Sequence, residues 1–311
     1  MKMMKSKYYL IISVGLLLTG LVSCEKIIDI TIPEKERKIV VNGLVADNQP
    51  VRIHLSRSRS VLESDSLIFI SGGEVNLFSG TQLLGRFQED SIGFYTLPGF
   101  IPQVGQTYRL TASWGDLKPV EASAVLPARV PIISVDTATL IGEWGQQELR
   151  LKVKFSDPAG EKNVYGFGVD MTYKEFDYLT MTWTGRKITQ QAYLYGKDER
   201  FLKDESTNFE GKFYFEDLLF DGMTKTVEFG LSDFSYFDSD TIWLNVNLEQ
   251  LDLSYYKYIL SYSAYQNANG NPFAEPVQVF TNVTGGYGIF SGSSTSSFPI
   301  ITKGGSRKFV K

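Results

Sequence analysis

Cysteine and histidine are nearly absent from this 311-residue chain, which contains one of each, Cys24 and His54. A single cysteine cannot form an internal disulfide bond. A zinc site built from cysteine and histidine needs several such ligands, and a serine–histidine–aspartate triad could use only His54. The composition therefore excludes a disulfide scaffold and argues strongly against both kinds of active site. We interpret His54 as a histidine on the solvent face of a strand.

An excess of basic residues is also lacking. The formal net charge is −4 at pH 7, with 31 lysines and arginines against 35 acidic residues. The first 23 residues hold three lysines and no acid, so the chain from Cys24 onward has a charge of −7. Proteins that bind nucleic acid or anionic membrane surfaces electrostatically are typically basic. We therefore expect no nucleic-acid partner and no electrostatic membrane patch.

The N-terminus has the pattern of an export signal. A short basic segment precedes an apolar run, Tyr8 to Val22, that is too short for a confident membrane-spanning helix. The run ends in Leu21-Val22-Ser23-Cys24, which has the spacing of a lipobox. Residues 1–23 are thus predicted to be a lipoprotein signal peptide, with Cys24 as the lipid attachment site. The alternative is a free thiol after an ordinary signal peptide.

A lipid on Cys24 would place the protein on a membrane. Each buried CH₂ of an acyl chain such as palmitate contributes about 0.8 kcal/mol, so several chains would anchor the protein essentially permanently. The charged, turn-prone segment 24–37 is predicted to be the tether between the lipid and the folded part.

The rest of the chain is predicted to be all-β. Short runs of alternating apolar residues, separated by glycine, asparagine, aspartate and proline, favour an immunoglobulin-like or transthyretin-like sandwich over residues 38–126. The segments Ile39–Val45 and Val51–Arg57 form its first predicted hairpin. Two prolines in Leu126–Pro131 indicate a domain junction.

Residues 132–311 are predicted to form a second β domain with one helix. Apolar spacing predicts the helix over 254–266, with Tyr255, Tyr258, Ile259 and Tyr262 against a sheet. The expected details around it are a strand over 178–183, a long loop over 185–211, a buried Phe273, a strand over 277–281 and a loop over 291–297.

Candidate ligand-contacting residues are few. Trp144 and Trp183 stand next to turns, which favours exposure and contact with a ligand or partner, although aromatic rings more often fill cores. Arg52, Arg57 and Arg59 could hold an anion, but Arg52 and Arg59 lie on either side of a predicted loop, which favours a solvated face. The carboxylate pairs Glu175/Asp177, Glu216/Asp217 and Asp238/Asp240 invite a hydrolase interpretation that chance also explains. A calcium site at Asp233, Asp238 and Asp240 lacks the ordered ligand spacing.

Several segments resemble one family. They are Cys24 with its lipobox, Ile39-Val40-Val41-Asn42-Gly43, Val51-Arg52-Ile53-His54-Leu55-Ser56, Gly93-Phe94-Tyr95, Phe155-Ser156-Asp157-Pro158, Asn271-Pro272-Phe273-Ala274-Glu275-Pro276 and Asn282-Val283-Thr284-Gly285-Gly286-Tyr287-Gly288-Ile289-Phe290. Together they resemble DUF4249, a family of Bacteroidetes lipoproteins. The resemblance implies an outer-membrane lipoprotein that accompanies a TonB-dependent receptor, and it implies no catalytic residue and no cofactor.

The sequence thus leads us to expect a non-enzymatic outer-membrane lipoprotein that is an accessory or ligand-capture partner of a TonB-dependent receptor. A free-standing glycan- or peptide-binding lipoprotein is the alternative, and a hydrolase is the third class. The periplasmic and the cell-surface face of the outer membrane both stay open.

Overall fold

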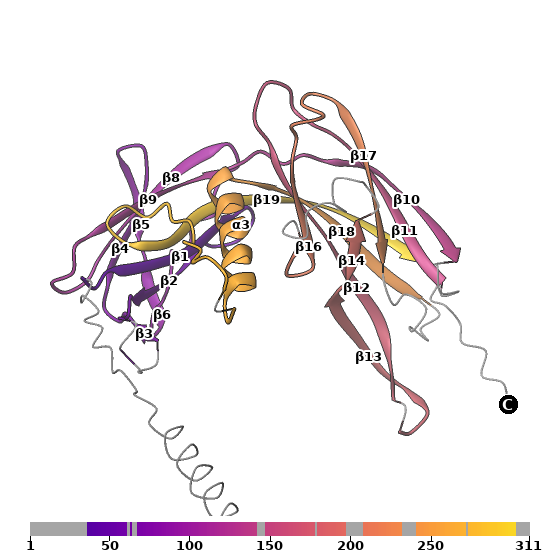
Figure 1. Ribbon diagram of the computed structural model, residues 1–311, viewed down its shortest axis with the longest axis horizontal. Helices are drawn as coiled ribbons and strands as arrows, with labels where there is room; N and C mark the ends of the chain where they lie inside the picture. Colours follow the sequence, from indigo (N-terminus) through magenta and orange to yellow (C-terminus); the bar gives the residue numbers. More distant parts are fainter. Residues whose placement is uncertain are drawn as a thin grey trace, which may run out of the picture. The chain divides into compact units, whose positions relative to one another are not determined.

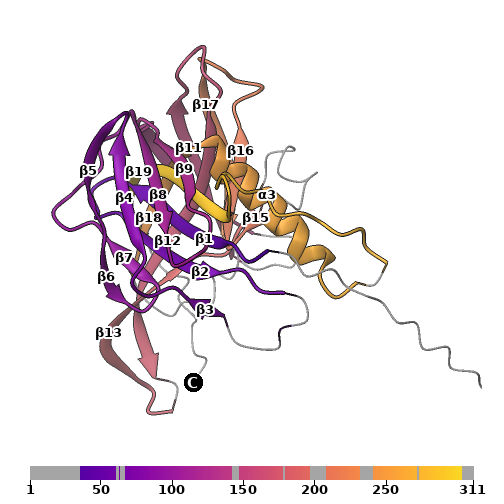
Figure 2. The ribbon, with the colours of Figure 1, turned by 90° about the vertical axis from the view of Figure 1, so that its left-hand side faces the viewer.

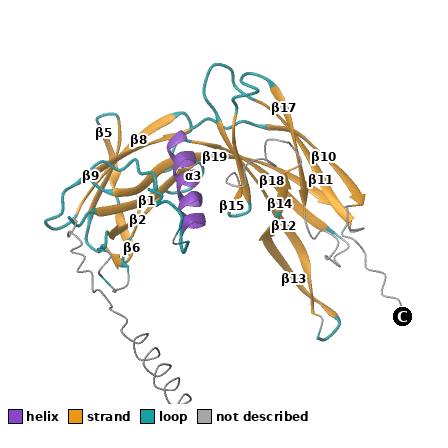
Figure 3. Cartoon of the chain, in the orientation of Figure 1, coloured by secondary structure: helices purple, strands orange, loops and turns teal. Residues whose placement is uncertain are grey.

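The computed structural model describes residues 36–60, 63, 67–141, 147–177, 179–196, 208–231, 241–271 and 273–302. One compact unit runs from Arg37 to Lys311. Strands predominate in the described residues, and α3 (Leu253–Ala268) is the one helix among them (Figure 3). The predicted all-β fold with a single helix is therefore confirmed.

The strands form three sheets (Figure 1). Their bounds are β1 (Ile39–Ala46), β2 (Arg52–Arg57), β3 (Ile68–Phe69), β4 (Glu74–Ser79), β5 (Gln82–Arg86), β6 (Gln88–Ser91), β7 (Phe94–Thr96), β8 (Gln106–Ser113), β9 (Val120–Leu126), β10 (Ile132–Ile141), β11 (Gln147–Ser156), β12 (Val164–Asp177), β13 (Thr182–Gln191), β14 (Leu194–Gly196), β15 (Asn208–Phe209), β16 (Lys212–Glu216), β17 (Thr224–Leu231), β18 (Ile242–Leu251) and β19 (Tyr287–Thr302). The largest sheet has the order β15-β16-β12-β18-β19-β1-β2-β7-β6, with β13 beside β12 and β3 beside β2. The two smaller sheets have the orders β10-β11-β17-β14 and β5-β4-β8-β9.

Each smaller sheet forms a sandwich with one half of the large sheet. The first core lies between β5-β4-β8-β9 and the β1, β2 and β7 strands, with Ile53 and Leu77 fully or almost fully buried. The second lies between β10-β11-β17-β14 and the β12, β16 and β18 strands, where the Phe167 and Phe229 rings stack at 3.8 Å. Alternating residues of each strand enter a core because successive strand side chains point to opposite faces.

Strand β19 connects the two halves of the large sheet. Residues 287–293 pair in parallel with β1, and residues 293–302 pair antiparallel with β18. Glycine permits the close parallel approach, because a Cβ on Gly288 would lie 2.0 Å from the carbonyl oxygen of Val41. Gly288 also has φ = +98°, a conformation that other residues rarely adopt.

The predicted junction at Leu126–Pro131 falls between the two cores, since Leu126 belongs to the first and Val130 to the second. Even so, Val283 and Phe290 enter the first core from the C-terminal part of the chain. The sandwich of residues 38–126 is therefore completed by a strand that comes much later in the sequence. Independent folding of the first predicted domain is untested, and the entry of Val283 and Phe290 into its core argues against it.

Some local predictions are wrong. Of the strand expected over 178–183, residues 179–181 form a turn and residues 182–183 begin β13, which continues where a long loop was expected. Almost every residue of β13 is exposed, so its sequence has no apolar alternation to reveal the strand. Residues 277–281 form no strand, whereas the serine-rich segment 291–297 lies inside β19, where residues 291–294 are buried. Whether these two segments form strands depends on pairing with neighbouring strands rather than on local propensity.

Helix α3 confirms the predicted element and corrects the predicted face. The side chain of Asp252 accepts a hydrogen bond from Ser254 N (3.0 Å) and caps the helix. The buried residues are Tyr256, Ile259 and Ser263, which pack outside the large sheet near β16 and β15 (Figure 2). The predicted tyrosines at 255, 258 and 262 are only half-buried.

Candidate functional site

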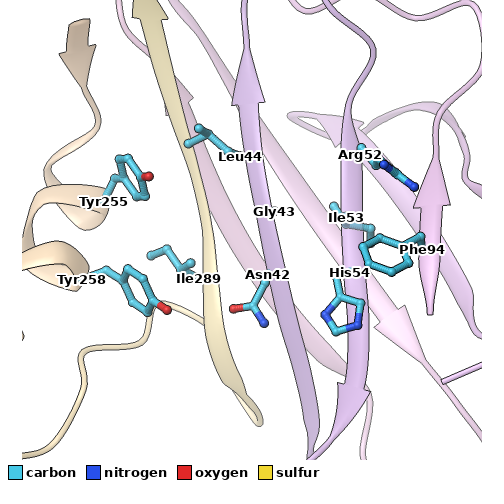
Figure 4. Close-up of a pocket in the computed structure, with 10 residues that line it drawn as sticks. All are labelled: Asn42, Gly43, Leu44, Arg52, Ile53, His54, Phe94, Tyr255, Tyr258 and Ile289. Carbon is cyan, nitrogen blue, oxygen red and sulfur yellow. The ribbon is translucent and has the colours of Figure 1, made fainter. Parts of the chain in front are cut away.

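A row of side chains crosses the outer face of the large sheet, on the side away from the first core. Asn42 on β1 is paired with His54 on β2 and with Ile289 on β19, and His54 is paired with Phe94 on β7. Directly paired residues share one face of a sheet. The register therefore brings four side chains from four strands side by side (Figure 4).

Helix α3 forms the opposite wall of a pocket over this row. Tyr255 and Tyr258 point from the helix toward the sheet, while Leu44 and Arg52 extend the floor (Figure 4). The pocket has a volume of about 370 Å³. Its size lies at the lower end of the range for small-molecule sites, which are concave and mostly apolar with a few placed polar groups.

Aromatic contacts hold the polar side chains of the floor in place. The His54 ring lies 5.0 Å from the Phe69 ring, edge to face, and 4.7 Å from the Phe94 ring. The Arg52 guanidinium lies over the same Phe94 ring, 4.7 Å from its centroid, as a cation–π contact. Arg52 also lies 3.7 Å from the Asp90 carboxylate.

His54 is the most unusual group in the pocket. Its Nε2 atom is buried and has no hydrogen-bond partner among the described residues. Burial lowers the pKa of His54 below its ordinary value of 6.5, so the imidazole is neutral at pH 7. The expected position on the outer face of a strand is correct, but the ring lies between two phenylalanines rather than in open solvent.

Three carboxylates gather elsewhere, at the turns that follow β11 and β16. The oxygens of Asp157, Asp217 and Asp221 lie within 4.8 Å of one another. Asp157 accepts a hydrogen bond from Gly222 N (2.8 Å), and Asp217 accepts one from Asn163 N (2.8 Å). Carboxylate oxygens are the ligands that hard cations prefer, but these hydrogen bonds already give the cluster a structural role in joining the two turns.

The other carboxylates considered for hydrolysis have separate partners. Glu175 binds Arg186 through two hydrogen bonds, and Glu216 lies 3.1 Å from Lys162. Each glutamate is thus paired with a basic side chain, which is not the arrangement of two facing carboxylates that hydrolysis by paired acids requires. Outside the described residues lie Asp233, Asp238 and Asp240.

A family model described as "Domain of unknown function (DUF4249)" matches residues 25–298. The chain belongs to the DUF4249 family. All ten residues that line the pocket fall inside the matched range. Among curated proteins, none matches this DUF4249 chain.

Of the two predicted contact residues of this DUF4249 protein, only Trp183 lies in the described part of the chain, and it does not line the pocket. Cys24 and Trp144 lie outside the described residues. Trp183 is 44% exposed, near the start of β13, and its ring contacts Phe176 edge to face at 5.0 Å. Among the described residues, no helix is long and apolar enough to cross a bilayer.

Sequence reasoning missed the pocket because its residues come from five separate elements. Arg52 and His54 alternate on one strand and could be assigned to one face. Tyr255 and Tyr258 are one helical turn apart and could also be assigned together. Only the pairing of β1 with both β2 and β19 shows that these two faces meet.

Proposed function

We propose that this DUF4249 protein is a non-enzymatic, lipid-anchored outer-membrane protein that captures a ligand as an accessory of a TonB-dependent receptor. The pocket below α3 carries the ligand-capture part of this proposal. Its walls are aliphatic and aromatic, and its polar groups are few and converge on one volume. Such a lining is typical of binding sites.

The lining residues favour binding over catalysis. They include no carboxylate, no lysine, no cysteine and no serine or threonine hydroxyl. Hydrolysis by paired acids requires two carboxylates that flank the substrate. His54 and two tyrosines are the groups that could move a proton, and no serine, threonine or cysteine nucleophile accompanies His54 among the described lining residues.

The ring geometry favours a peptide-like ligand over a glycan. A sugar stacks on an open aromatic face, but Arg52 and His54 both contact Phe94. On α3, the Tyr258 and Tyr262 rings stack on each other at 5.7 Å, with 5° between their planes. The hydroxyl groups and ring edges of such tyrosines suit the amide groups and apolar side chains of an extended peptide segment.

The anchor part of the proposal depends on Cys24. The experiment compares wild type with Cys24→Ser during growth on labelled palmitate, followed by membrane fractionation. We expect the variant to lose the label and either leave the membrane or accumulate as an unprocessed precursor. A mature, labelled Cys24→Ser protein in the membrane fraction contradicts lipid attachment at this residue.

The partner and the ligand are tested together. The tagged protein is purified from detergent-solubilised outer membranes, and both co-purifying proteins and small molecules released by denaturation are identified by mass spectrometry. Leu44→Glu places a charge in the pocket, and Leu83→Glu on β5 is the control, because Leu83 is an exposed leucine remote from the lining set.

We expect a TonB-dependent receptor to co-purify with the wild type. We expect a bound ligand to be lost only in Leu44→Glu. A ligand without any receptor indicates the free-standing binding protein instead. Conversion of the ligand into a product by the wild-type protein contradicts the non-enzymatic role.

A further inference from the structure

The hairpin of β12 and β13 extends beyond the large sheet (Figure 1). Strand β12 pairs with β18 only as far as Tyr173, which lies opposite the first residue of β18, Ile242. From Lys174 onward β12 pairs with β13 alone. Residues 174–177 and 179–187 therefore form a two-stranded projection with its own turn.

The end of this projection is apolar and uncharged. Residues 179–185 read Leu-Thr-Met-Thr-Trp-Thr-Gly, without one charged side chain. Leu179 is 97% exposed and Met181 is 59% exposed. Met181 also adopts φ = +54°, a left-handed conformation that residues other than glycine rarely adopt. Strain of this kind is concentrated at functional positions.

The stem below the tip is firmly built. Arg186 donates to the two oxygens of Glu175 at 2.7 and 2.9 Å. Asp177 accepts a hydrogen bond from Leu179 N (2.8 Å) and so fixes the turn. Hydrogen bonds from Thr184 and Arg186 lower the pKa of Glu175, and the hydrogen bond from Leu179 N lowers the pKa of Asp177, so both carboxylates stay ionised at neutral pH. The charged groups of Glu175, Arg186 and Asp177 therefore already have hydrogen-bond partners within the hairpin.

The order of side chains along the hairpin matches the depth profile of a lipid surface. Leu179 and Met181 stand at the apex, Trp183 follows, and Arg186 and Lys187 come next. The one carboxylate near the apex, that of Asp177 opposite Thr182, is held by the backbone N–H groups of Leu179 and Thr180. Tryptophan prefers the boundary between headgroups and acyl chains, with cationic side chains at the headgroup level.

A protein partner suits this tip less well. A stable protein interface buries about 800 Å² on each partner, which is more than the few apolar side chains of a narrow turn supply. A bilayer can surround a narrow tip on every side. A protein that a lipid already holds at the membrane also needs only weak additional contacts, because its effective concentration there is high.

We propose that the tip around Leu179, Met181 and Trp183 inserts into the interfacial region of a lipid bilayer. The insertion goes beyond ligand capture, and it gives the anchored protein a second membrane contact. It is testable without the anchor, so its failure is distinguishable from failure of the lipid attachment at Cys24.

The test uses unlipidated protein of residues 25–311 with vesicles of phosphatidylethanolamine and phosphatidylglycerol. Binding is measured by co-sedimentation, and depth is measured by quenching of tryptophan fluorescence with brominated lipids. The tip variant is Leu179→Ser/Met181→Ser. The matched control is Leu218→Ser/Leu219→Ser, because both of these leucines are 73% exposed in another turn. Circular dichroism checks that every variant is folded.

We expect the wild type and the control to sediment with vesicles, and the tip variant to lose at least tenfold in apparent partitioning. Trp183→Phe should keep most of the binding but lose most of the quenching. Absence of wild-type binding, or equal loss in tip variant and control, overturns the proposal. Loss of a co-purifying membrane protein in the tip variant, with no vesicle binding by the wild type, assigns the tip to a protein partner and overturns it as well.

Discussion

The carboxylate of Asp252 accepts a hydrogen bond from the backbone N–H of Val125, at 2.8 Å across 127 positions of sequence. The same side chain accepts the N–H of Ser254 and caps α3. One residue therefore fastens the end of β9, in the first sandwich, to the start of the helix that forms a wall of the pocket.

Replacing Asp252 by alanine should destabilise the protein by about 1 to 2 kcal/mol, because a helix cap and a second backbone hydrogen bond are lost. Urea unfolding measures the change. Asp252→Asn should recover part of the loss, because its amide oxygen can still cap the helix. Asp116→Ala, in an exposed turn, is the control and should change stability by less than about 0.5 kcal/mol.

Truncation to alanine should destabilise the protein far more at Phe290 than at Phe273. The sequence led us to expect a buried Phe273, but that ring is 94% exposed, whereas Phe290 is fully buried in the first core. Phe290→Ala should cost about 3 to 5 kcal/mol because it leaves a cavity. Phe273→Ala should cost less than about 0.5 kcal/mol. Similar urea midpoints for the two variants are the result that contradicts this assignment.

A fragment of residues 38–125 should not form a stable sandwich. It lacks β19, which is the parallel partner of β1, and it lacks Val283 and Phe290 of the first core. We expect broad, weakly cooperative unfolding by circular dichroism. Adding residues 282–302 as a separate peptide should sharpen the transition. A sharp transition without the peptide supports independent folding of the predicted N-terminal domain.

The pocket histidine should make stability depend on pH. Burial lowers the pKa of His54 below 6.5, so the unfolded chain takes up a proton before the folded protein does. Stability from this source is complete above pH 6.5 and falls as the pH drops through the window between 6.5 and the lower folded pKa.

His54→Gln should remove that part of the pH dependence. Urea unfolding of the two proteins is compared at pH 7.5 and pH 5, where the carboxylates common to both contribute equally. The wild type should lose more stability than the variant on acidification. An equal loss shows that His54 does not titrate differently in the folded and unfolded chains.

The sequence predicts local elements well where burial on one face leaves a pattern. The hairpin of β1 and β2 follows from apolar alternation around a short polar connection, and α3 follows from helical spacing, a cap and a terminating Asn-Gly pair. Strand β13 leaves no such pattern because both of its faces are exposed. The serine- and glycine-rich part of β19 looks like a loop in the sequence, because its parallel partner β1 lies more than 200 residues away along the chain.

By itself, the sequence determined the all-β class, the helix that follows β18, the lack of an internal disulfide bond and the family to which the chain belongs. The tertiary structure alone decided that β19 completes the first sandwich, that Phe273 faces solvent, and that Asn42, His54 and Tyr258 surround one pocket. The physical reason is that side-chain periodicity records which face of an element is buried. It does not record the partner that buries it, and pairing between distant strands is set by the fit of whole sheets.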